Sequence, residues 1–237
     1  MATESSIALV TGANKGIGFE IARELARRGF RVLLGTRDAR RGAEAASALA
    51  LEGGAVESVA LDVSRTDSVS AAAAEVQRRW ERVDVLVNNA GVLLDRQQPP
   101  SQTPPDLLRA TFETNLIGVL QTTATFRPLL LASGKARVIN LSSGGGQLQA
   151  MSGSIWAPAY QISKTALNAL TCLLAGEFKP LDIPVNAVCP GWCRTDMGGT
   201  GAPRTAAEGA ATAVWLATEA PRELTGRFFQ DQREIPW

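Results

Sequence analysis

The chain has 237 residues, no histidine, three cysteines and a formal charge of +1 from 24 basic and 23 acidic residues. This balance argues against the basic stripe of a nucleic-acid-binding protein, and the lack of histidine excludes a serine-histidine triad. Residues 1–6 are polar and no run approaches the ~20 apolar residues of a membrane span, so we expect a soluble, cytoplasmic, single domain over residues 1–237 that acts on a small molecule.

Short apolar runs and helical periodicity alternate along the chain. The predicted strands cover residues 7–10, 31–34, 56–61, 83–87, 137–141, 184–188 and 227–229. The predicted helices cover residues 17–28, 38–51, 66–80, 106–131, 158–177 and 205–217. Asp38 is the expected N-cap of the second helix, and Pro128 is expected to bend the fourth. This alternation predicts an α/β fold with a parallel sheet covered by helices on both faces.

A glycine-rich turn, TGANKGIG at residues 11–18, follows the first strand and precedes the first helix. Glycines permit a tight turn and close approach of the backbone, and a helix N-terminus offers unpaired N–H groups to a pyrophosphate. The spacing is GxxxGxG rather than GxGxxG, so a plain strand-to-helix turn stays open as the alternative at this point.

The end of the second strand indicates which dinucleotide would be preferred. An acidic residue that binds the ribose 2′-OH is expected there, but the chain has Gly35, Thr36 and Arg37. Arg37, together with Lys15 in the glycine turn, suits a 2′-phosphate and favours NADP(H). The alternative is that both are solvated surface cations, and Asp38 weakens the local positive charge.

Tyr160 is the only tyrosine, and Lys164, one of four lysines, follows it by four positions. On a helix this spacing places a phenol and an ammonium side by side, which suits proton transfer. The alternative is an aromatic residue at the edge of a core helix with a solvated lysine. Cys172, Cys189 and Cys193 match no metal-ligand or CxxC spacing, so we expect reduced thiols and no metal site.

These motifs resemble those of the short-chain dehydrogenase/reductase family over nearly the whole chain. Residues 11–18 resemble its TGxxxGxG turn, residues 88–91 its NNAG segment, and residues 160–164 its YxxxK pair. Further matches are Asp62 with Val63, Asn115, Ser142 with Ser143, and Pro190 and Gly191 followed by Thr195. Residues 191–197, 208–210 and 226–229 are most similar to NADPH-dependent carbonyl reductases, although the long insertion before the tyrosine in the animal members is missing.

The resemblance implies a Rossmann-type doubly wound parallel sheet of about seven strands, and NADP(H)-dependent reduction of a ketone, aldehyde or quinone. The catalytic residues it implies are Asn115, Ser143, Tyr160 and Lys164. The cofactor-binding residues are Gly12, Asn14, Lys15, Gly16, Ile17, Gly18, Arg37, Asp62, Val63, Asn89, Ala90, Gly91, Tyr160, Lys164, Pro190, Gly191 and Thr195.

In the implied mechanism Ser143 binds the substrate carbonyl and Tyr160 donates the proton. Lys164 is expected to bind the nicotinamide ribose and to lower the pKa of Tyr160 by roughly two units. Asn115 supports a water relay to Lys164, and Ser142 serves packing or hydrogen bonding. Four residues are candidates for the substrate mouth, with core packing as the alternative for each: Met151, Trp156, Trp192 and Met197. Cys193 nearby is either an inert or a modifiable thiol.

Two other functions remain open at this stage. One is a non-catalytic sensor that binds NADP(H) or works through partners, and the other is an alcohol dehydrogenase that works in the oxidative direction. Many family members pair through the YxxxK helix and the long helix before it, so the resemblance also implies a homodimer or homotetramer. The substrate itself is not readable, but residues 197–205 are short and glycine-rich, which predicts an open pocket.

Overall fold

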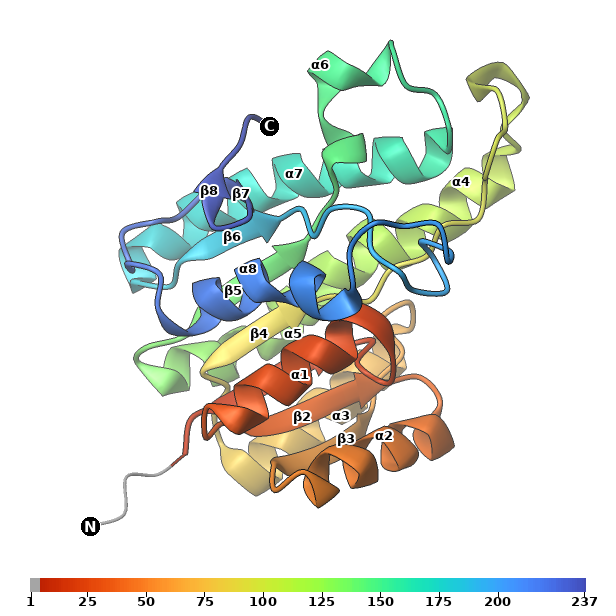
Figure 1. The fold of residues 1–237 in the computed structure, drawn as a ribbon. Coiled ribbons are helices and arrows are strands. Elements are labelled where there is room, and N and C mark those ends of the chain that lie inside the picture. Colours follow the sequence, from red (N-terminus) through yellow and green to blue (C-terminus); the bar gives the residue numbers. More distant parts are fainter. Residues whose placement is uncertain (1–4) are drawn as a thin grey trace.

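The computed structural model describes residues 5–237, so Met1 to Glu4 of the polar N-terminus lie outside the described part. Its centre is a sheet in the order β3-β2-β1-β4-β5-β6-β7-β8 (Figure 1). Strands β1 to β7 are parallel, and β8 pairs with β7 in the antiparallel direction. The strands are β1 (Ile7–Thr11), β2 (Arg31–Thr36), β3 (Ala55–Ala60), β4 (Val85–Asn88), β5 (Arg137–Leu141), β6 (Val185–Val188), β7 (Phe228–Gln230) and β8 (Arg233–Glu234).

Helices cover both faces of the sheet, as predicted. One face packs against α1 (Gly16–Arg27), α2 (Ala39–Leu51) and α8 (Ala206–Thr218). The other face packs against α3 (Thr66–Trp80), α5 (Gly118–Ser133) and α7 (Pro158–Phe178). In β1, Ala8 and Val10 join the first core and Ile7 and Leu9 the second, because successive side chains of a strand point to opposite faces. The fold is therefore the predicted doubly wound α/β fold.

Local capping explains where two of these helices begin. The predicted N-cap Asp38 accepts a hydrogen bond from the backbone N–H of Arg41 at 3.0 Å, so α2 begins at the expected position. Helix α8 begins with a capping box in which Thr205 and Glu208 satisfy each other's backbone N–H groups.

The long helix predicted over residues 106–131 is interrupted in the structure. It consists of α4 (Pro105–Phe112), a π-helical turn η2 (Glu113–Ile117) and α5. The interruption surrounds Asn115, whereas α5 continues through Pro128. The predicted bend site was therefore not the place where the helix changes, and π-turns of this kind are frequent at functional sites.

Several short elements were not predicted. Helix α6 (Leu148–Met151) lies in the loop before α7, and the turns η1 (Pro100–Gln102), η3 (Gly144–Gly146) and η4 (Lys179–Leu181) are 3-10 helices. Strand β8 makes the sheet eight-stranded rather than seven-stranded. Its two residues are charged and exposed, so no apolar pattern marks it in the sequence.

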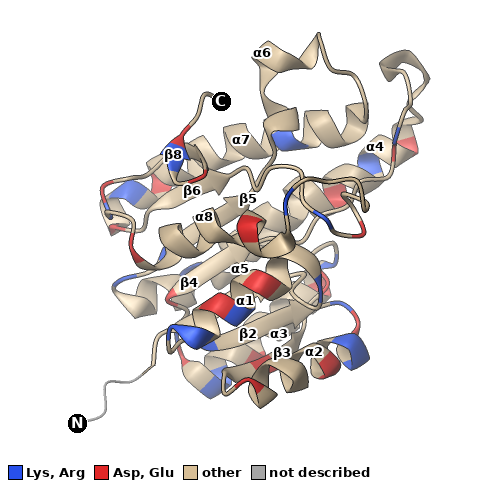
Figure 2. Ribbon diagram, viewed as in Figure 1, with Lys and Arg blue, Asp and Glu red and all other residues tan. Residues whose placement is uncertain are grey.

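The charged residues are mixed over the surface of the described chain. Figure 2 shows acidic and basic positions side by side on helices such as α1 and α2, and many form ion pairs, for example Arg23 with Glu20 and Arg40 with Glu44. Among the described residues no helix is both long and apolar enough to cross a membrane, and no group of His, Cys, Asp or Glu could hold a metal ion.

The strand order reverses beside β1, which lies between β2 and β4. At such a point the loops after neighbouring strands diverge and leave a crevice at the carboxyl ends of the strands, where α/β proteins bind ligands. The glycine turn follows β1 and the NNAG segment follows β4 at this edge. The motifs that carry the sequence-based prediction therefore meet at one end of the sheet.

Candidate active site

Tyr160 and Lys164 lie on the first two turns of α7, and both are buried, at 7 % and 4 % exposure. The Nζ atom of Lys164 lies 5.6 Å from the centre of the Tyr160 ring and donates a hydrogen bond to the carbonyl oxygen of Leu141 at 2.7 Å. The two side chains share one face of the helix, as their spacing predicts. The alternative with a solvated lysine is wrong, because Lys164 is in the interior at the carboxyl end of β5.

Asp95 caps α7 although it lies 64 residues earlier in the chain. The N-cap position, Ala157, has no side chain that can accept a hydrogen bond. The buried carboxylate of Asp95 accepts hydrogen bonds from the backbone N–H groups of Ala159 and Tyr160. A negative charge at a helix N-terminus also interacts favourably with the helix dipole. Asp95 thus fixes the turn that carries Tyr160.

Ser142 and Ser143 follow β5, and their side chains have different partners. Ser143 is half-buried, accepts a hydrogen bond from the N–H of Gly145 at 3.1 Å and hydrogen-bonds to Tyr160. Ser142 is buried and donates to Asn168 Oδ1 at 2.5 Å. Both hydroxyls border the same pocket, but only that of Ser143 contacts Tyr160, and Ser142 serves the internal hydrogen bonding expected of it.

Burial dominates the titration of the tyrosine and the lysine. It raises the pKa of Tyr160 to about 12, with the hydrogen bond from Ser143 acting in the opposite direction. It lowers the pKa of Lys164 to about 8. The prediction that Lys164 lowers the pKa of the phenol is therefore wrong for the cofactor-free protein, because removal from water disfavours the charged form of both groups.

Asn115 lies at the centre of the π-helical turn η2 and is completely buried. Its amide nitrogen donates to the carbonyl of Val92 at 2.9 Å and to Ser163 Oγ at 3.0 Å, and its amide oxygen accepts from the N–H of Val92 at 2.8 Å. A Cβ atom at Gly91 would lie 3.5 Å from Asn115 Oδ1 and 3.8 Å from Lys164 Nζ. Asn115 therefore joins the segment after β4 to α7 beside the lysine.

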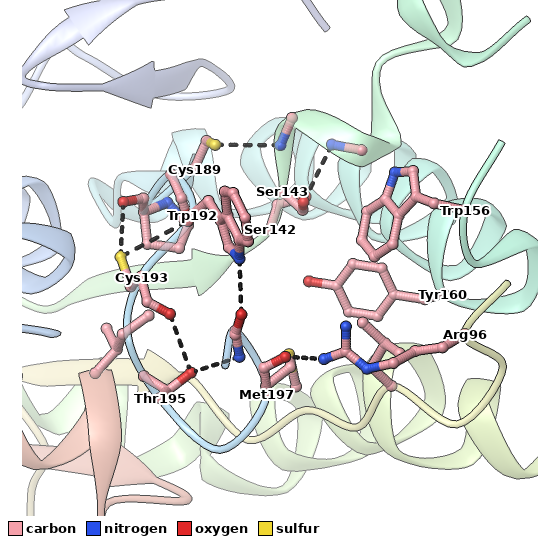
Figure 3. A pocket seen from close by; sticks show the side chains of 17 residues that line it. Arg96, Ser142, Ser143, Trp156, Tyr160, Cys189, Trp192, Cys193, Thr195 and Met197 are labelled. Atoms are coloured by element: carbon pink, nitrogen blue, oxygen red, sulfur yellow. Dashed lines mark hydrogen bonds between the residues drawn. The ribbon is translucent and has the colours of Figure 1, made fainter. Parts of the chain in front are cut away.

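A cavity of about 490 Å³ lies at this edge of the sheet. Tyr160 and Ser143 face it, and the Trp156 ring lies 5.5 Å from that of Tyr160 (Figure 3). Most of the remaining lining is apolar or backbone: Ile17, Leu93, Gly144, Gly145, Cys189, Pro190, Gly191, Trp192, Cys193, Thr195, Met197 and Gly198. The pocket offers a carbonyl group one polar end at Ser143 and Tyr160, and its other walls are mostly apolar apart from Arg96.

Three of the four residues expected at the substrate mouth line this pocket. Trp156, Trp192 and Met197 do so, and Trp192 is 60 % exposed, which excludes core packing for it. Met151 lies on α6 and does not line the pocket. Cys193 lines it but is buried, and burial raises the pKa of its thiol, which favours an inert role.

The glycine turn is shaped for a ligand that approaches the backbone. Gly12 and Gly16 have φ values of 64° and 61°, which favour glycine, and a Cβ atom at Gly18 would lie 2.3 Å from Asn89 Nδ2. Asn89 donates to the carbonyls of Thr11 and Gly12, so the segment after β4 supports the turn. Helix α1 has no side-chain cap, which leaves its first N–H groups to a phosphate. These residues fit a dinucleotide.

The two cations predicted to select NADP(H) differ in their surroundings. Lys15 Nζ lies 2.5 Å from Asp196 Oδ2 in an exposed ion pair. Arg37 is exposed and has no ion pair within the described residues. Asp38 caps α2 and pairs with Arg41, so its negative charge is compensated by Arg41 rather than by Arg37. The preference for a 2′-phosphate rests mainly on Arg37.

The remaining predicted cofactor residues line the same edge. Asp62 accepts hydrogen bonds from the N–H and the hydroxyl of Ser64, which holds its carboxylate at the turn after β3, and Val63 beside it is buried. Pro190, Gly191 and Thr195 follow β6 and line the pocket. The methyl carbon of Thr195 lies 3.3 Å from the position of a Cβ atom at Gly16, so the loop after β6 reaches the glycine turn.

Three further residues of this region were missed by sequence reasoning. Asp95 caps α7, Arg96 lines the pocket, and Cys189 accepts a hydrogen bond from the N–H of Gly144 at 3.1 Å. Asp95 and Arg96 lie in a loop after a strand and match no motif spacing, so the sequence does not mark them as site residues. Only the packing of this loop against α7 and against the loop after β6 gives them a place in the site.

Comparison with known proteins agrees with the fold and the motifs. The family model described as short chain dehydrogenase matches residues 6–205. The chain is 36 % identical to the short-chain dehydrogenase anuI of Penicillium roqueforti, over 99 % of this chain and 97 % of that protein. It is 32 % identical to carbonyl reductase [NADPH] 1 of Mus musculus, with complete coverage of both chains.

Solved structures give the same result. A gluconate 5-dehydrogenase from Burkholderia cenocepacia, in complex with NADP and tartrate, superposes with a TM-score of 0.86 at 26 % identity, over 96 % of this chain and 94 % of that one. The oxidoreductase yciK from E. coli superposes with a TM-score of 0.87 at 29 % identity, over 96 % and 95 % of the two chains. The chain therefore belongs to the short-chain dehydrogenase/reductase family, in the branch that contains the carbonyl reductases.

Proposed function

We propose that this protein reduces the carbonyl group of a ketone, aldehyde or quinone to an alcohol with NADPH. The observation that carries the proposal is the presence of Ser143 and Tyr160 at one end of a largely apolar pocket, with the buried ammonium of Lys164 5.6 Å from the centre of the Tyr160 ring. A phenol that donates a proton, a hydroxyl that binds a carbonyl and a buried cation can together support the reduction of a carbonyl group.

Tyr160 is the proton donor in this mechanism. With a pKa of about 12, the phenol is protonated at neutral pH, as a donor in the reductive direction must be. Ser143 hydrogen-bonds the substrate oxygen beside it and stabilises the negative charge that develops there. The ammonium of Lys164, held by the Leu141 carbonyl 5.6 Å from the centre of the phenol ring, offsets part of the cost that burial imposes on the phenolate after proton transfer.

NADP(H) supplies the hydride when it is bound. The glycine turn with Asn14 and Ile17 and the N-terminus of α1 would hold its pyrophosphate, Arg37 its 2′-phosphate, and Asp62 with Val63 its adenine side. The segment 89–91, Tyr160, Lys164 and the loop with Pro190, Gly191 and Thr195 would border the nicotinamide end. Two relatives named above support the choice of NADP(H): a carbonyl reductase named for NADPH and a dehydrogenase solved with NADP.

Asn115 acts as a positioning residue in this proposal. Its amide connects Val92 to Ser163 on α7, one position before Lys164. It therefore orients the lysine and provides a polar path for a water relay to it.

The test is NADPH consumption against quinones, cyclic ketones and aldehydes, with NADH measured beside it. We expect turnover with NADPH in preference to NADH, and a loss in kcat of well over tenfold for Tyr160→Phe, with the binding of NADPH retained. A loss of less than tenfold would contradict the role of Tyr160. Binding of NADPH without consumption across the whole panel would favour a sensor instead.

We also propose that the protein forms a homodimer or homotetramer. Helices α5 and α7 carry exposed apolar side chains at Leu120, Leu131, Ile162 and Leu173. A second copy would remove this surface from water. We expect a dimeric or tetrameric mass in analytical ultracentrifugation, and a monomeric mass at micromolar concentration would refute the proposal.

A further inference from the structure

Arg96 is the only charged residue that lines the described pocket. It lies in the loop after β4, and its side chain enters the pocket on the same side as Tyr160 and Met197 (Figure 3). A single guanidinium among apolar walls creates a positive potential inside the pocket. The proposed transfer of a hydride and a proton to a carbonyl does not itself require this charge.

The backbone on both sides of Arg96 is fixed. The carboxylate of Asp95 holds the N-terminus of α7, and the N–H of Gln97 donates to the carbonyl of Trp156 at 2.8 Å. Both anchors belong to the segment that carries Tyr160. The position of Arg96 is therefore coupled to that of the proposed proton donor rather than set by a freely moving loop.

The guanidinium of Arg96 is poorly satisfied. It donates to the backbone carbonyl of Met197, and no carboxylate pairs with it within the described residues. The neighbouring acids are engaged elsewhere, because Asp95 caps α7 and Asp196 pairs with Lys15. A guanidinium has five N–H donors in a fork that matches a carboxylate, so donors remain for a ligand.

We infer that the substrates of this site carry an anionic group, a carboxylate, in addition to the carbonyl, and that Arg96 binds it. This inference rests on the proposed carbonyl reduction and names its substrate class. The carbonyl binds between Ser143 and Tyr160, the apolar body contacts Trp156 and the other walls, and the carboxylate pairs with Arg96 at the mouth. Since Arg96 is exposed, the pair is screened by salt.

Arg96 also has a structural role, which must be distinguished from the binding of a carboxylate. Its bond to Met197 joins the loop after β4 to the loop after β6 across the pocket. If this were its only role, loss of Arg96 would change the turnover of neutral and anionic substrates by the same factor. The ratio between matched acid and ester substrates separates the two roles.

The experiment compares 3-formylbenzoate and 4-formylbenzoate with their methyl esters, using NADPH and low salt. We expect the wild type to prefer the acids, and Arg96→Gln to lower the acid-to-ester ratio of kcat/KM by about tenfold, the size of a charge-assisted hydrogen bond. Arg96→Lys should retain part of the preference. Arg109→Gln, which removes the same charge from α4 outside the pocket, should leave the ratio unchanged.

Binding is measured in parallel by quenching of tryptophan fluorescence in the complex with NADP⁺, since Trp156 and Trp192 line the pocket. Acid binding should weaken about tenfold in Arg96→Gln, and more salt should weaken it in the wild type. If Arg96→Gln and the wild type have the same acid-to-ester ratio, in turnover or in binding, the inference is overturned. This holds even if the protein reduces the esters. Acid-selective binding that depends on Arg96, without turnover of either compound, supports it while the proposed reduction fails.

Discussion

Replacing Lys164 with methionine should abolish activity and yet stabilise the cofactor-free protein at neutral pH. Lys164 is 4 % exposed, no carboxylate pairs with it among the described residues, and burial lowers its pKa from 10.5 to about 8. At pH 7 the folded protein therefore keeps an ammonium charged in the interior at a cost in free energy.

The size of this cost follows from the pKa values. The difference between 10.5 and about 8 corresponds to about 3 kcal/mol, at ~1.4 kcal/mol per pH unit. Between about pH 8 and pH 10.5 the unfolded chain holds the proton on Lys164 and the folded chain does not. The free energy of unfolding of the wild type therefore rises as the pH rises through this window, and this gain is lost as the pH falls back to about 8. The variant also loses the hydrogen bond to the Leu141 carbonyl, worth about 1 kcal/mol, which leaves a net gain of about 2 kcal/mol at pH 7.

Urea denaturation of both proteins at pH 7 and pH 10 measures this effect. We expect Lys164→Met to be the more stable protein at pH 7, and the difference to disappear or reverse at pH 10. Lys179→Met removes an exposed lysine and should show no such dependence on pH. The reasoning is refuted if Lys164→Met is less stable than the wild type at pH 7, or if the difference between the two proteins is the same at both pH values.

Two further substitutions test the supports of the site. Asp95→Ala should lower the free energy of unfolding by about 1–2 kcal/mol, because the N–H of Ala159 in α7 loses its hydrogen-bond acceptor. Asp95→Asn should retain part of this stabilisation. A loss below about 0.5 kcal/mol for Asp95→Ala in urea denaturation speaks against the cap. Gly18→Ala should weaken NADPH binding more than tenfold in a fluorescence titration, since its Cβ would collide with Asn89 and the Gly12 carbonyl. Its control, Gly176→Ala on the exposed side of α7, has open space and should stabilise the protein by up to about 1 kcal/mol with unchanged binding; equal affinity in both variants would contradict the role of Gly18.

Much of this protein is determined by local patterns in its sequence. Apolar runs and helical periodicity predicted seven of the eight strands and the main helices, because buried parallel strands and amphipathic helices leave regular signals. Spacing placed Tyr160 and Lys164 on one face of a helix, and glycines at 12, 16 and 18 marked the turn after β1. These features depend on residues within a few positions of one another.

Other features depend on contacts between distant segments, and only the tertiary structure decided them. Asp95 meets the N-terminus of α7 across 64 positions, and Arg96 reaches Met197 across 101. Tyr160 and Lys164 are buried because α7 packs against the end of β5, and this burial raises the pKa of the tyrosine, against expectation, and lowers that of the lysine. The sequence alone thus determined which groups can do the chemistry, whereas packing decided their pKa values and placed a cation at the pocket mouth, since solvation depends on everything that surrounds a side chain in space.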